Sequence, residues 1–270
     1  MSIRIGIGLD NFASAGIDAD ALAFFARVTA AGGTLSGTEK TAVNNLVLDM
    51  KAANIWTAMK AVYPMVGASA AACAQNLIGS GFTGTFNGGW TYASTGVTPN
   101  GTNAYMDTFF NPYNQFSGNL ASLSYYGRTA IGTGSNNGNL IGTEVQGIST
   151  GNRFTIIEYL SGNYISCFGN APLSELLVGS ASITPAFFIS SRQSTTNFFG
   201  LKNKTTLGTI TTLDTTKLPS SNVYVGAINI TRYSTNECAF AHIGNGLTIS
   251  QSNTFCDVVQ AFQTTLSRQV

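Results

Sequence analysis

Charge is the scarcest property of this sequence. Charged side chains make up only 9% of the 270 residues, and 13 lysines and arginines nearly balance 12 aspartates and glutamates, whereas an ordinary globular domain carries about 25% charged residues. No basic run follows any segment, so nucleic acid is not an expected partner. Hydrophobic residues make up 44% of the chain, which is enough apolar surface to offset the entropy of ordering. The composition therefore predicts a folded protein whose copies repel one another little.

Long apolar runs are also missing. Gly, Asn, Ser or Thr interrupts each apolar stretch well before the ~18 residues that a membrane-spanning helix needs. The first residues, MSIRIGIGLDNF, have neither the apolar region nor the small-residue cleavage site of a signal peptide. We therefore expect synthesis in a cytoplasm and no insertion into a membrane.

Few residues are available for metal or nucleophile chemistry. Cys73, Cys167, Cys238 and Cys256 lie far apart and show no CxxC or Cys/His spacing, so we expect four buried free thiols and no zinc site. His242 is the single histidine, and it lies in ECAFAHIG at an expected strand end without a neighbouring Cys or Asp to orient it. A structural or surface role is favoured over a catalytic one. No calcium-loop pattern occurs, and the sequence predicts no metal and no cofactor.

The sequence also lacks a pair of carboxylates spaced to lie on the same face of one strand. Glycoside hydrolysis needs two carboxyl groups about 5 to 9.5 Å apart, and alternate positions of one strand place two side chains on the same face. No two carboxylates after residue 80 are spaced i, i+2 or i, i+4; they are Asp107, Glu144, Glu158, Glu175, Asp214, Glu237 and Asp257. We therefore predict a non-enzymatic protein without catalytic residues. A polysaccharide hydrolase that takes its carboxylates from different strands is the less favoured alternative.

Helix-forming residues are concentrated before about Gly79. Asp18 and Asp20 provide capping oxygens before ALAFFARVTAA, which predicts a helix over residues 19–31 that ends at two glycines. SGTE at residues 36–39 matches a capping box and predicts the start of a second helix. An apolar stripe at helical spacing follows it, made of Val43, Leu46, Val47 and Met50. A third short helix, ended by Pro64, is predicted from Trp56, Met59 and Tyr63.

The period of the hydrophobic pattern changes to two after Phe82. Leu123 and Tyr125 alternate with serines, and NVYVGAINI at residues 222–230 alternates in the same way. Many short strands separated by Asn/Gly/Ser turns predict a mainly β protein, with an antiparallel sandwich of the jelly-roll or a related Greek-key type. A final apolar stripe predicts a C-terminal helix at about 250–267. The expected regions are an N-terminal arm (1–16), a helical head (17–79) and a β-sandwich with the C-terminal helix (80–270).

Two segments are candidates for recognition. Trp90, Tyr92 and Tyr105 punctuate an Asn/Gly/Thr-rich stretch that also contains Asn103. Aromatic rings pack on the apolar faces of sugars while amides bond to hydroxyl groups, so these residues are candidates for glycan binding. The simpler interpretation, which the sequence favours, is that they form the first strands and turns of the sandwich. The second segment is the arm, where alternating apolar residues predict a strand that pairs with a neighbouring subunit: Ile3, Ile5, Ile7 and Leu9.

Five stretches carry a resemblance to a known group of proteins. They are FFARVTAAGG, EKTAVNNLVLDMKAANIWTAMKAVYPMVGASA, FNGGWTYASTGVTPNGTNAYMDT, FAHIGNGLT and VQAFQTTLSRQV. Together they resemble phage-encoded virion proteins with a laminin-G or concanavalin A-like jelly roll, found in structural modules of tailed phages of flavobacteria and their relatives. The resemblance spans most of the chain, but the stretches describe packing and turns, so no catalytic or metal residue is carried over.

The resemblance implies a virion protein that is made in the host cytoplasm and assembles with other virion proteins. A chain that begins with its own Met1 is expected to be a stand-alone subunit. The leading hypothesis is a structural subunit of a tail, baseplate, fibre or head decoration that acts by protein–protein assembly, as a homo-oligomer such as a trimer. The alternative is a carbohydrate-binding module on the virion surface that recognises a host-surface glycan. Fold class alone does not separate these hypotheses from hydrolysis.

Overall fold

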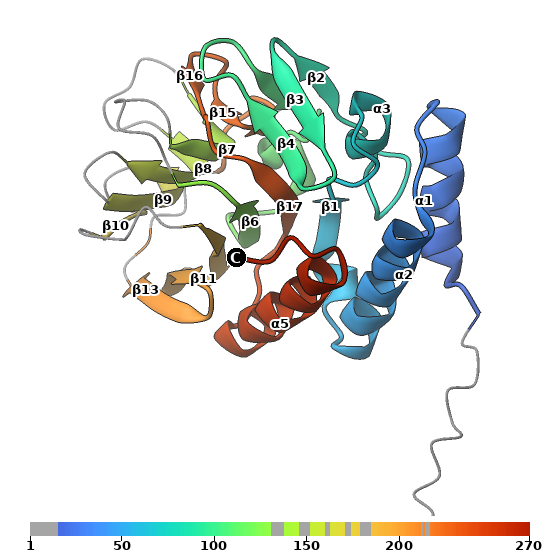
Figure 1. Ribbon diagram of the computed structural model, residues 1–270. Helices are drawn as coiled ribbons and strands as arrows, with labels where there is room; N and C mark the ends of the chain where they lie inside the picture. Colours follow the sequence, from blue (N-terminus) through green and yellow to red (C-terminus); the bar gives the residue numbers. More distant parts are fainter. Residues whose placement is uncertain are drawn as a thin grey trace, which may run out of the picture.

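Two antiparallel β-sheets face each other in the computed structural model, and helices cover the outer side of one of them (Figure 1). The structure describes residues 16–130, 138–145, 152–159, 163–170, 174–178, 185–211, 213 and 217–270. The predicted mainly β antiparallel sandwich, with helices near its N-terminal and C-terminal ends, is confirmed. The four residues of the predicted arm (Ile3, Ile5, Ile7 and Leu9) lie outside the described residues.

The sheet beneath the helices, called here the helix-side sheet, has the strand order β13-β12-β11-β6-β17-β4-β3, and β1 pairs with β17. Its strands are β1 (Met59–Tyr63), β3 (Trp90–Ala93), β4 (Gly96–Pro99), β6 (Ala121–Gly127), β11 (Ala186–Ser194), β12 (Asn197–Lys202), β13 (Thr205–Ile210) and β17 (Cys238–Asn245). The central strands β6, β11 and β17 are buried along most of their length, because both of their faces are covered.

The opposite sheet, called here the far sheet, has the strand order β10-β9-β8-β7-β14-β5-β2. Its strands are β2 (Thr85–Asn87), β5 (Tyr105–Asp107), β7 (Asn139–Glu144), β8 (Asn152–Tyr159), β9 (Asn163–Asn170), β10 (Glu175–Val178) and β14 (Tyr224–Val225). A short hairpin of β15 (Ala227–Ile228) and β16 (Arg232–Tyr233) packs beside β7. The remaining short elements are α3 (Ala70–Cys73) and α4 (Pro112–Gln115).

The helices begin where the sequence predicts them. In α1 (Ala19–Ala30), the Asp18 side chain accepts a hydrogen bond from the Asp20 amide at 2.9 Å. In α2 (Gly37–Ala52), both hydrogen bonds of the predicted capping box between Ser36 and Glu39 are present. The predicted C-terminal helix is α5 (Ile249–Thr265), and a second capping box starts it.

The predicted third helix is wrong. Residues 56–58 form one 3-10 turn, η1 (Trp56–Ala58), and residues 59–63 form strand β1, which pairs with β17. Val62 packs toward the helices, whereas Tyr63 packs between the two sheets. A strand that is covered on both faces has an almost continuous apolar sequence, and hydrophobic spacing alone does not distinguish it from a short buried helix.

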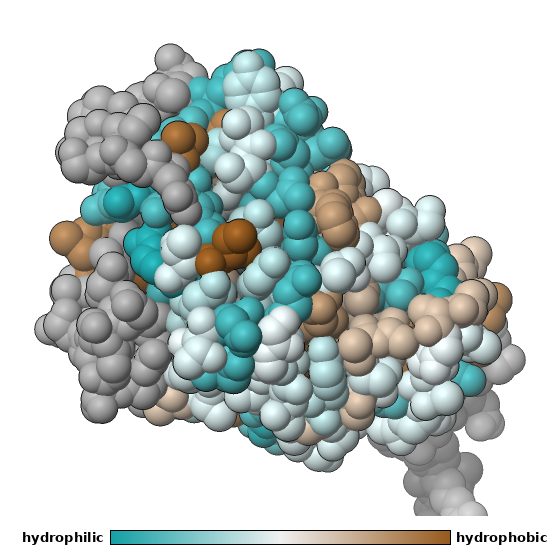
Figure 2. All heavy atoms as spheres, turned by 90° about the horizontal axis from the view of Figure 1, so that it is seen from above, coloured by the Kyte–Doolittle hydropathy of each residue, from teal (hydrophilic) through white to brown (hydrophobic). Residues whose placement is uncertain are grey.

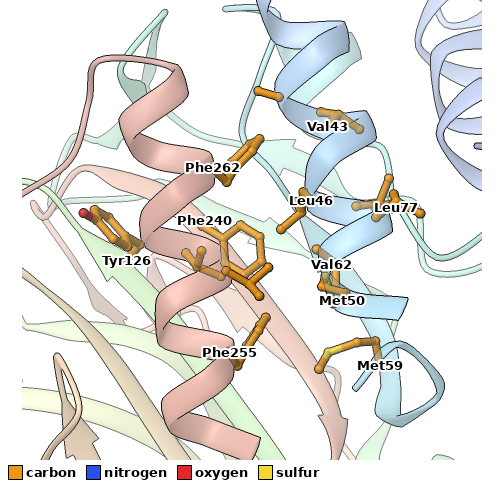
Figure 3. Packing of buried hydrophobic residues seen from close by; sticks show 14 of the residues in the cluster. Val43, Leu46, Met50, Met59, Val62, Leu77, Tyr126, Phe240, Phe255 and Phe262 are labelled. Carbon is orange, nitrogen blue, oxygen red and sulfur yellow. The ribbon is translucent and has the colours of Figure 1, made fainter. Parts of the chain in front are cut away.

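Two hydrophobic cores lie on either side of the helix-side sheet. One fills the space between the sheets, and the other joins the sheet to α1, α2 and α5. In the second core, Phe240 of β17 contacts Phe255 and Phe262 of α5 at ring-centroid distances of 5.9 and 6.2 Å. Figure 3 shows these rings between α5 and the α2 residues Leu46 and Met50. The N-terminal and C-terminal helices therefore share one core with the sheet.

A buried arginine fastens the C-terminal residues to this core. Arg268 is 1% exposed, and its guanidinium donates hydrogen bonds to the carbonyls of Met65 (2.8 Å), Pro64 (2.6 Å) and Ala239 (2.9 Å). Burial lowers the pKa of Arg268 to about 10. Because carbonyl oxygens satisfy its donors, this cation is held without an ion pair to a carboxylate among the described residues.

Candidate functional site

The predicted glycan residues Trp90 and Tyr92 lie together on β3, at the edge of the helix-side sheet. Phe86 of β2 packs against both rings, with centroid distances of 5.0 Å to Trp90 and 5.2 Å to Tyr92. The Trp90 indole donates a hydrogen bond to the Asn87 carbonyl at 2.9 Å. Burial raises the pKa of Tyr92 to about 12. These side chains close the edge of the sandwich where the two sheets meet, so their role in the structure is packing.

The other two predicted glycan residues occupy different places. Asn103 is exposed in a turn, where its Oδ1 accepts hydrogen bonds from the Gly89 amide (3.2 Å) and from Asn100 (2.7 Å). Tyr105 lies on β5, next to the inward-facing Met106, and therefore points to the outer face of the far sheet. The structure thus brings Trp90 and Tyr92 together and separates Tyr105 from them.

The outer face of the far sheet carries one continuous cross-strand row. The row runs across all seven strands of this sheet through Thr85, Asp107, Tyr224, Gly142, Thr155, Cys167 and Glu175. Its centre consists of small buried residues, and its larger polar side chains stand toward the ends. Gly142 is required in this row, because its φ is +145° and a Cβ atom would lie 2.3 Å from the Phe154 carbonyl oxygen.

An aromatic pair stands on one side of this face. The rings of Tyr105 and Tyr224 meet edge to face, with centroids 5.5 Å apart. Burial raises the pKa of Tyr224, and the negative charge of Asp107 adds to the effect. Asp107 is itself held by hydrogen bonds from the Asn222 side chain (3.0 and 3.2 Å) and from the Phe109 amide (2.8 Å). Two aromatic rings and a fixed carboxylate therefore lie side by side.

Four charged residues gather on the other side of the same face. Glu144 Oε2 lies 3.3 Å from Arg153 Nε and 2.5 Å from Arg232 Nη2, and Arg153 Nη1 lies 2.7 Å from Glu175 Oε2. Each of these side chains is between 17% and 23% exposed. Such a cluster is unexpected in a chain with only 9% charged residues. Partly exposed ion pairs contribute little to stability on average, so stability alone is a weak reason for it.

A cavity of about 240 Å³ lies between the aromatic pair and the charged cluster. Its lining consists of Glu144, Val145, Ser220, Ser221, Tyr224 and Asn229. Asn229 fixes one wall, because its side chain accepts hydrogen bonds from Thr143 Oγ1 (3.1 Å) and the Glu144 amide (2.9 Å) and donates one to the Glu144 carbonyl (2.6 Å). The cavity therefore combines a ring and a carboxylate on two strands with hydroxyl groups and an amide on the adjoining bend and turn.

The hairpin beside this cavity has a strained tip. Asn229 and Ile230 both have positive φ, at +55° and +49°, and the Ile230 side chain is 43% exposed. A β-branched residue rarely adopts this conformation.

Figure 2 views the molecule from above Figure 1, from the end where β15 and β16 lie. This face shows small separate hydrophobic patches on a mostly hydrophilic or neutral surface.

Sequence reasoning did not single out the residues of this cavity. It placed NVYVGAINI on a half-buried strand, and the outward position of Tyr224 between Val223 and Val225 was a usable signal. Glu144 and Arg153 belong to adjacent strands, and their pairing depends on the register of β7 and β8. That register is not visible in the sequence.

His242 lies within β17 and not at a strand end. Its Nε2 is 3.0 Å from Ser122 Oγ, its Nδ1 is 2.6 Å from Ser124 Oγ, and its ring packs on the edge of Phe255 of α5. Complete burial lowers the pKa of His242 to about 3, so the ring is neutral. This arrangement gives the histidine a structural position under α5.

The four cysteines are buried thiols that form no disulfide in the structure. Burial raises the pKa of Cys73 to about 12 and that of Cys256 to about 11, which keeps both thiols protonated at neutral pH. No group of three or more His, Cys, Asp or Glu side chains suited to a metal ion occurs within the described ranges. No helix in the described part of the chain is long and apolar enough to cross a membrane.

Comparisons with known proteins identify the fold. No protein-family model and no curated protein matches the sequence. Domain 4 of AbnA, an extracellular arabinanase of family GH43 from Geobacillus stearothermophilus that was solved with arabinotriose, is similar in structure, with a TM-score of 0.56 and 13% identity over 75% of this chain and 98% of that one. The binding domain of botulinum neurotoxin serotype D has a TM-score of 0.50 at 12% identity, over 76% of this chain and 52% of that chain. Trypanosoma rangeli sialidase has a TM-score of 0.47 at 14% identity, over 80% of this chain and 38% of the sialidase. At these identities the likeness to the arabinanase domain and the toxin binding domain shows a shared β-sandwich fold.

Proposed function

We propose that the protein is a non-catalytic carbohydrate-binding module that uses the cavity on the outer face of the far sheet. The observation that carries the proposal is the cavity itself, which Tyr224 and Glu144 line together with two serines and Asn229. An aromatic ring packs against the apolar face of a sugar, while carboxylate, amide and hydroxyl groups bond to its hydroxyls. At about 240 Å³ the cavity is smaller than the ~300 Å³ at which pockets for drug-sized ligands begin, so it suits one sugar unit of a longer glycan.

The fold supports this proposal at the level of analogy. The arabinanase domain that shares the sandwich was solved in complex with arabinotriose. A sandwich of this kind also hosts other functions, so the assignment depends on the cavity and its side chains.

The arrangement of the carboxylates favours binding over hydrolysis. Glu144 and Glu175 both contact the guanidinium of Arg153, which therefore lies between them, and Asp107 is held by Asn222. A glycosidase needs an acid and a nucleophile or base facing one bond from opposite sides. The hydrolase alternative predicts release of reducing ends from glycans by the purified protein, lost in Asp107→Asn.

Replacing the central ring tests the proposed function. Tyr224→Ala removes the stacking surface, so we expect affinity for a bound oligosaccharide to fall at least tenfold, about 1.4 kcal/mol, while the melting temperature changes little. The measurement is calorimetric titration with the best ligand from an oligosaccharide array. Trp56→Ala is the matched control, because Trp56 packs in the core under the helices, away from the far sheet. Equal affinity for the wild type and Tyr224→Ala would place the binding elsewhere or remove it.

We further propose that this module acts on a virion, as the sequence resemblance implies. Ile17 and Leu22, which follow the arm at the start of α1, are 52% and 50% exposed, and exposed apolar side chains at this end favour contact with another protein. Deletion of residues 2–12 should then abolish incorporation into particles and leave the melting temperature unchanged. Normal incorporation of the deletion variant, measured by particle composition, contradicts assembly through the arm.

A further inference from the structure

We infer that the cavity selects neutral, hydroxyl-rich sugars over acidic sugars such as uronic or sialic acids, an inference that rests on the proposed function. The first reason is the charge of the cavity lining. Glu144 is the charged residue among the described side chains that line it, and neither Arg153 nor Arg232 is part of the lining. Among the described lining residues, a ligand in the cavity therefore meets a carboxylate and no cation.

The two oxygens of Glu144 have different surroundings. Oε2 is buried, and it makes the contacts to Arg153 at 3.3 Å and to Arg232 at 2.5 Å. Both ion-pair distances of Glu144 are to Oε2, while the side chain as a whole is 17% exposed. The two arginines thus hold the carboxylate through Oε2, and we place the ligand's donor at Oε1. Sugar hydroxyls are such donors, whereas a sugar carboxylate offers only acceptors.

A second carboxylate adds to this preference. Asp107 stands directly opposite Tyr224 in the strand pair β5–β14, and its negative charge acts on the Tyr224 ring that lines the cavity. Its hydrogen-bond partners, Asn222 and the Phe109 amide, are uncharged. Arg153 and Arg232 are engaged with Glu144 and Glu175. An acidic ligand therefore meets a lining carboxylate that offers it no donor, and the charge of Asp107 behind Tyr224 opposes it further, which lowers its affinity.

A matched pair of ligands tests the inference on the whole protein. An oligosaccharide array that contains neutral pentose and hexose oligomers together with uronic-acid and sialic-acid oligomers identifies the best neutral ligand. The primary alcohols of the best-binding neutral hexose oligomer are then oxidised to carboxylates, and both forms are titrated by calorimetry at pH 7. We expect the neutral form to bind at least tenfold more tightly. If the two forms bind equally, or the acidic form binds better, the inference is wrong and the proposed function stands. If no glycan in the array binds, the proposed function itself fails.

Variants locate the source of the discrimination. Glu144→Gln keeps the shape of the side chain and removes its charge, so the ratio of neutral to acidic affinity should fall at least fivefold. Asp257→Asn makes the same chemical change in an exposed ion pair with Lys204, on the opposite side of the molecule, and should leave the ratio unchanged. A ratio that stays the same in Glu144→Gln, with a wild-type melting curve, overturns the role of Glu144. Should that variant fail to fold, the matched ligand pair on the wild type still decides the inference.

Discussion

The two sheets of the sandwich differ in how their faces are used. The helix-side sheet is covered on both faces, by the core between the sheets and by the core under the helices. The far sheet has one face in the core, while its other face carries Tyr224, Glu144 and Asp107, which are all partly exposed. Burial on two faces concentrates stability in the helix-side sheet. The far sheet is left with rigid strands whose outward residues are available for binding.

The largest expected effect breaks the helix-side core. Phe240→Ala removes a buried ring that contacts Phe187, Phe255 and Phe262, so we expect the free energy of unfolding to fall by about 3–5 kcal/mol. Tyr105→Ala, on the outer face of the far sheet, should cost no more than about 1 kcal/mol. Urea denaturation of both variants measures the difference. Similar losses in the two variants would mean that stability is spread evenly over the two sheets.

The next largest effect is the pH dependence of stability, which arises from His242 in strand β17 of the helix-side sheet. His242 has an ordinary pKa of 6.5, and burial lowers its pKa to about 3 in the folded protein. The unfolded chain therefore binds a proton below pH 6.5 that the folded protein does not, so stability is present above pH 6.5 and is lost as the pH falls toward 3. The slope is about 1.4 kcal/mol per pH unit, or roughly 2 kcal/mol between pH 6.5 and 5.

The variant His242→Gln isolates this effect. Glutamine keeps hydrogen-bonding groups near Ser122 and Ser124 but does not titrate, so the loss of stability between pH 7 and 5 should be about 2 kcal/mol smaller than in the wild type. Urea denaturation at a series of pH values gives both curves. Parallel curves for the two proteins would show that the histidine ring is not the group that titrates.

Features that depend on neighbouring residues were predictable from the sequence, whereas features that depend on strand pairing were not. Helix starts depend on a few neighbouring residues, so the caps of Asp18 and of Ser36 with Glu39 were visible in the sequence. Strand β1 was not, because Met59, Val62 and Tyr63 also fit a helical spacing and only the pairing with β17 separates the two.

The cavity was harder to predict than the fold. Glu144, Arg153 and Arg232 come from β7, β8 and β16, and the register between strands, which depends on the packing of the whole sheet, brings them together. Residue type makes Tyr105 a candidate, and it does lie at the aromatic pair, but its partner Tyr224 is more than a hundred positions away in the chain. Residue type makes Trp90 and Tyr92 equally good candidates, and they lie at the edge of the sandwich.

The smallest effect compares a turn of the hairpin beside the far sheet with a turn of the helix-side sheet. Asn229-Ile230 beside the far sheet and Asn203-Lys204 between β12 and β13 both have two consecutive residues at positive φ. This conformation costs a β-branched residue roughly 1–2 kcal/mol, and glycine adopts it freely at some cost in entropy. Ile230→Gly should therefore stabilise the fold by about 0.5–1 kcal/mol, whereas Lys204→Gly should gain less, since lysine is unbranched and its ion pair with Asp257 is lost. Thermal melting measures both changes, and titration with the best oligosaccharide gives the second readout.

Because Ile230 is exposed beside the cavity, we expect its loss to weaken glycan binding while Lys204→Gly leaves binding unchanged. A gain in stability with unchanged affinity would remove the hairpin tip from the binding site and confine recognition to the strands of the far sheet.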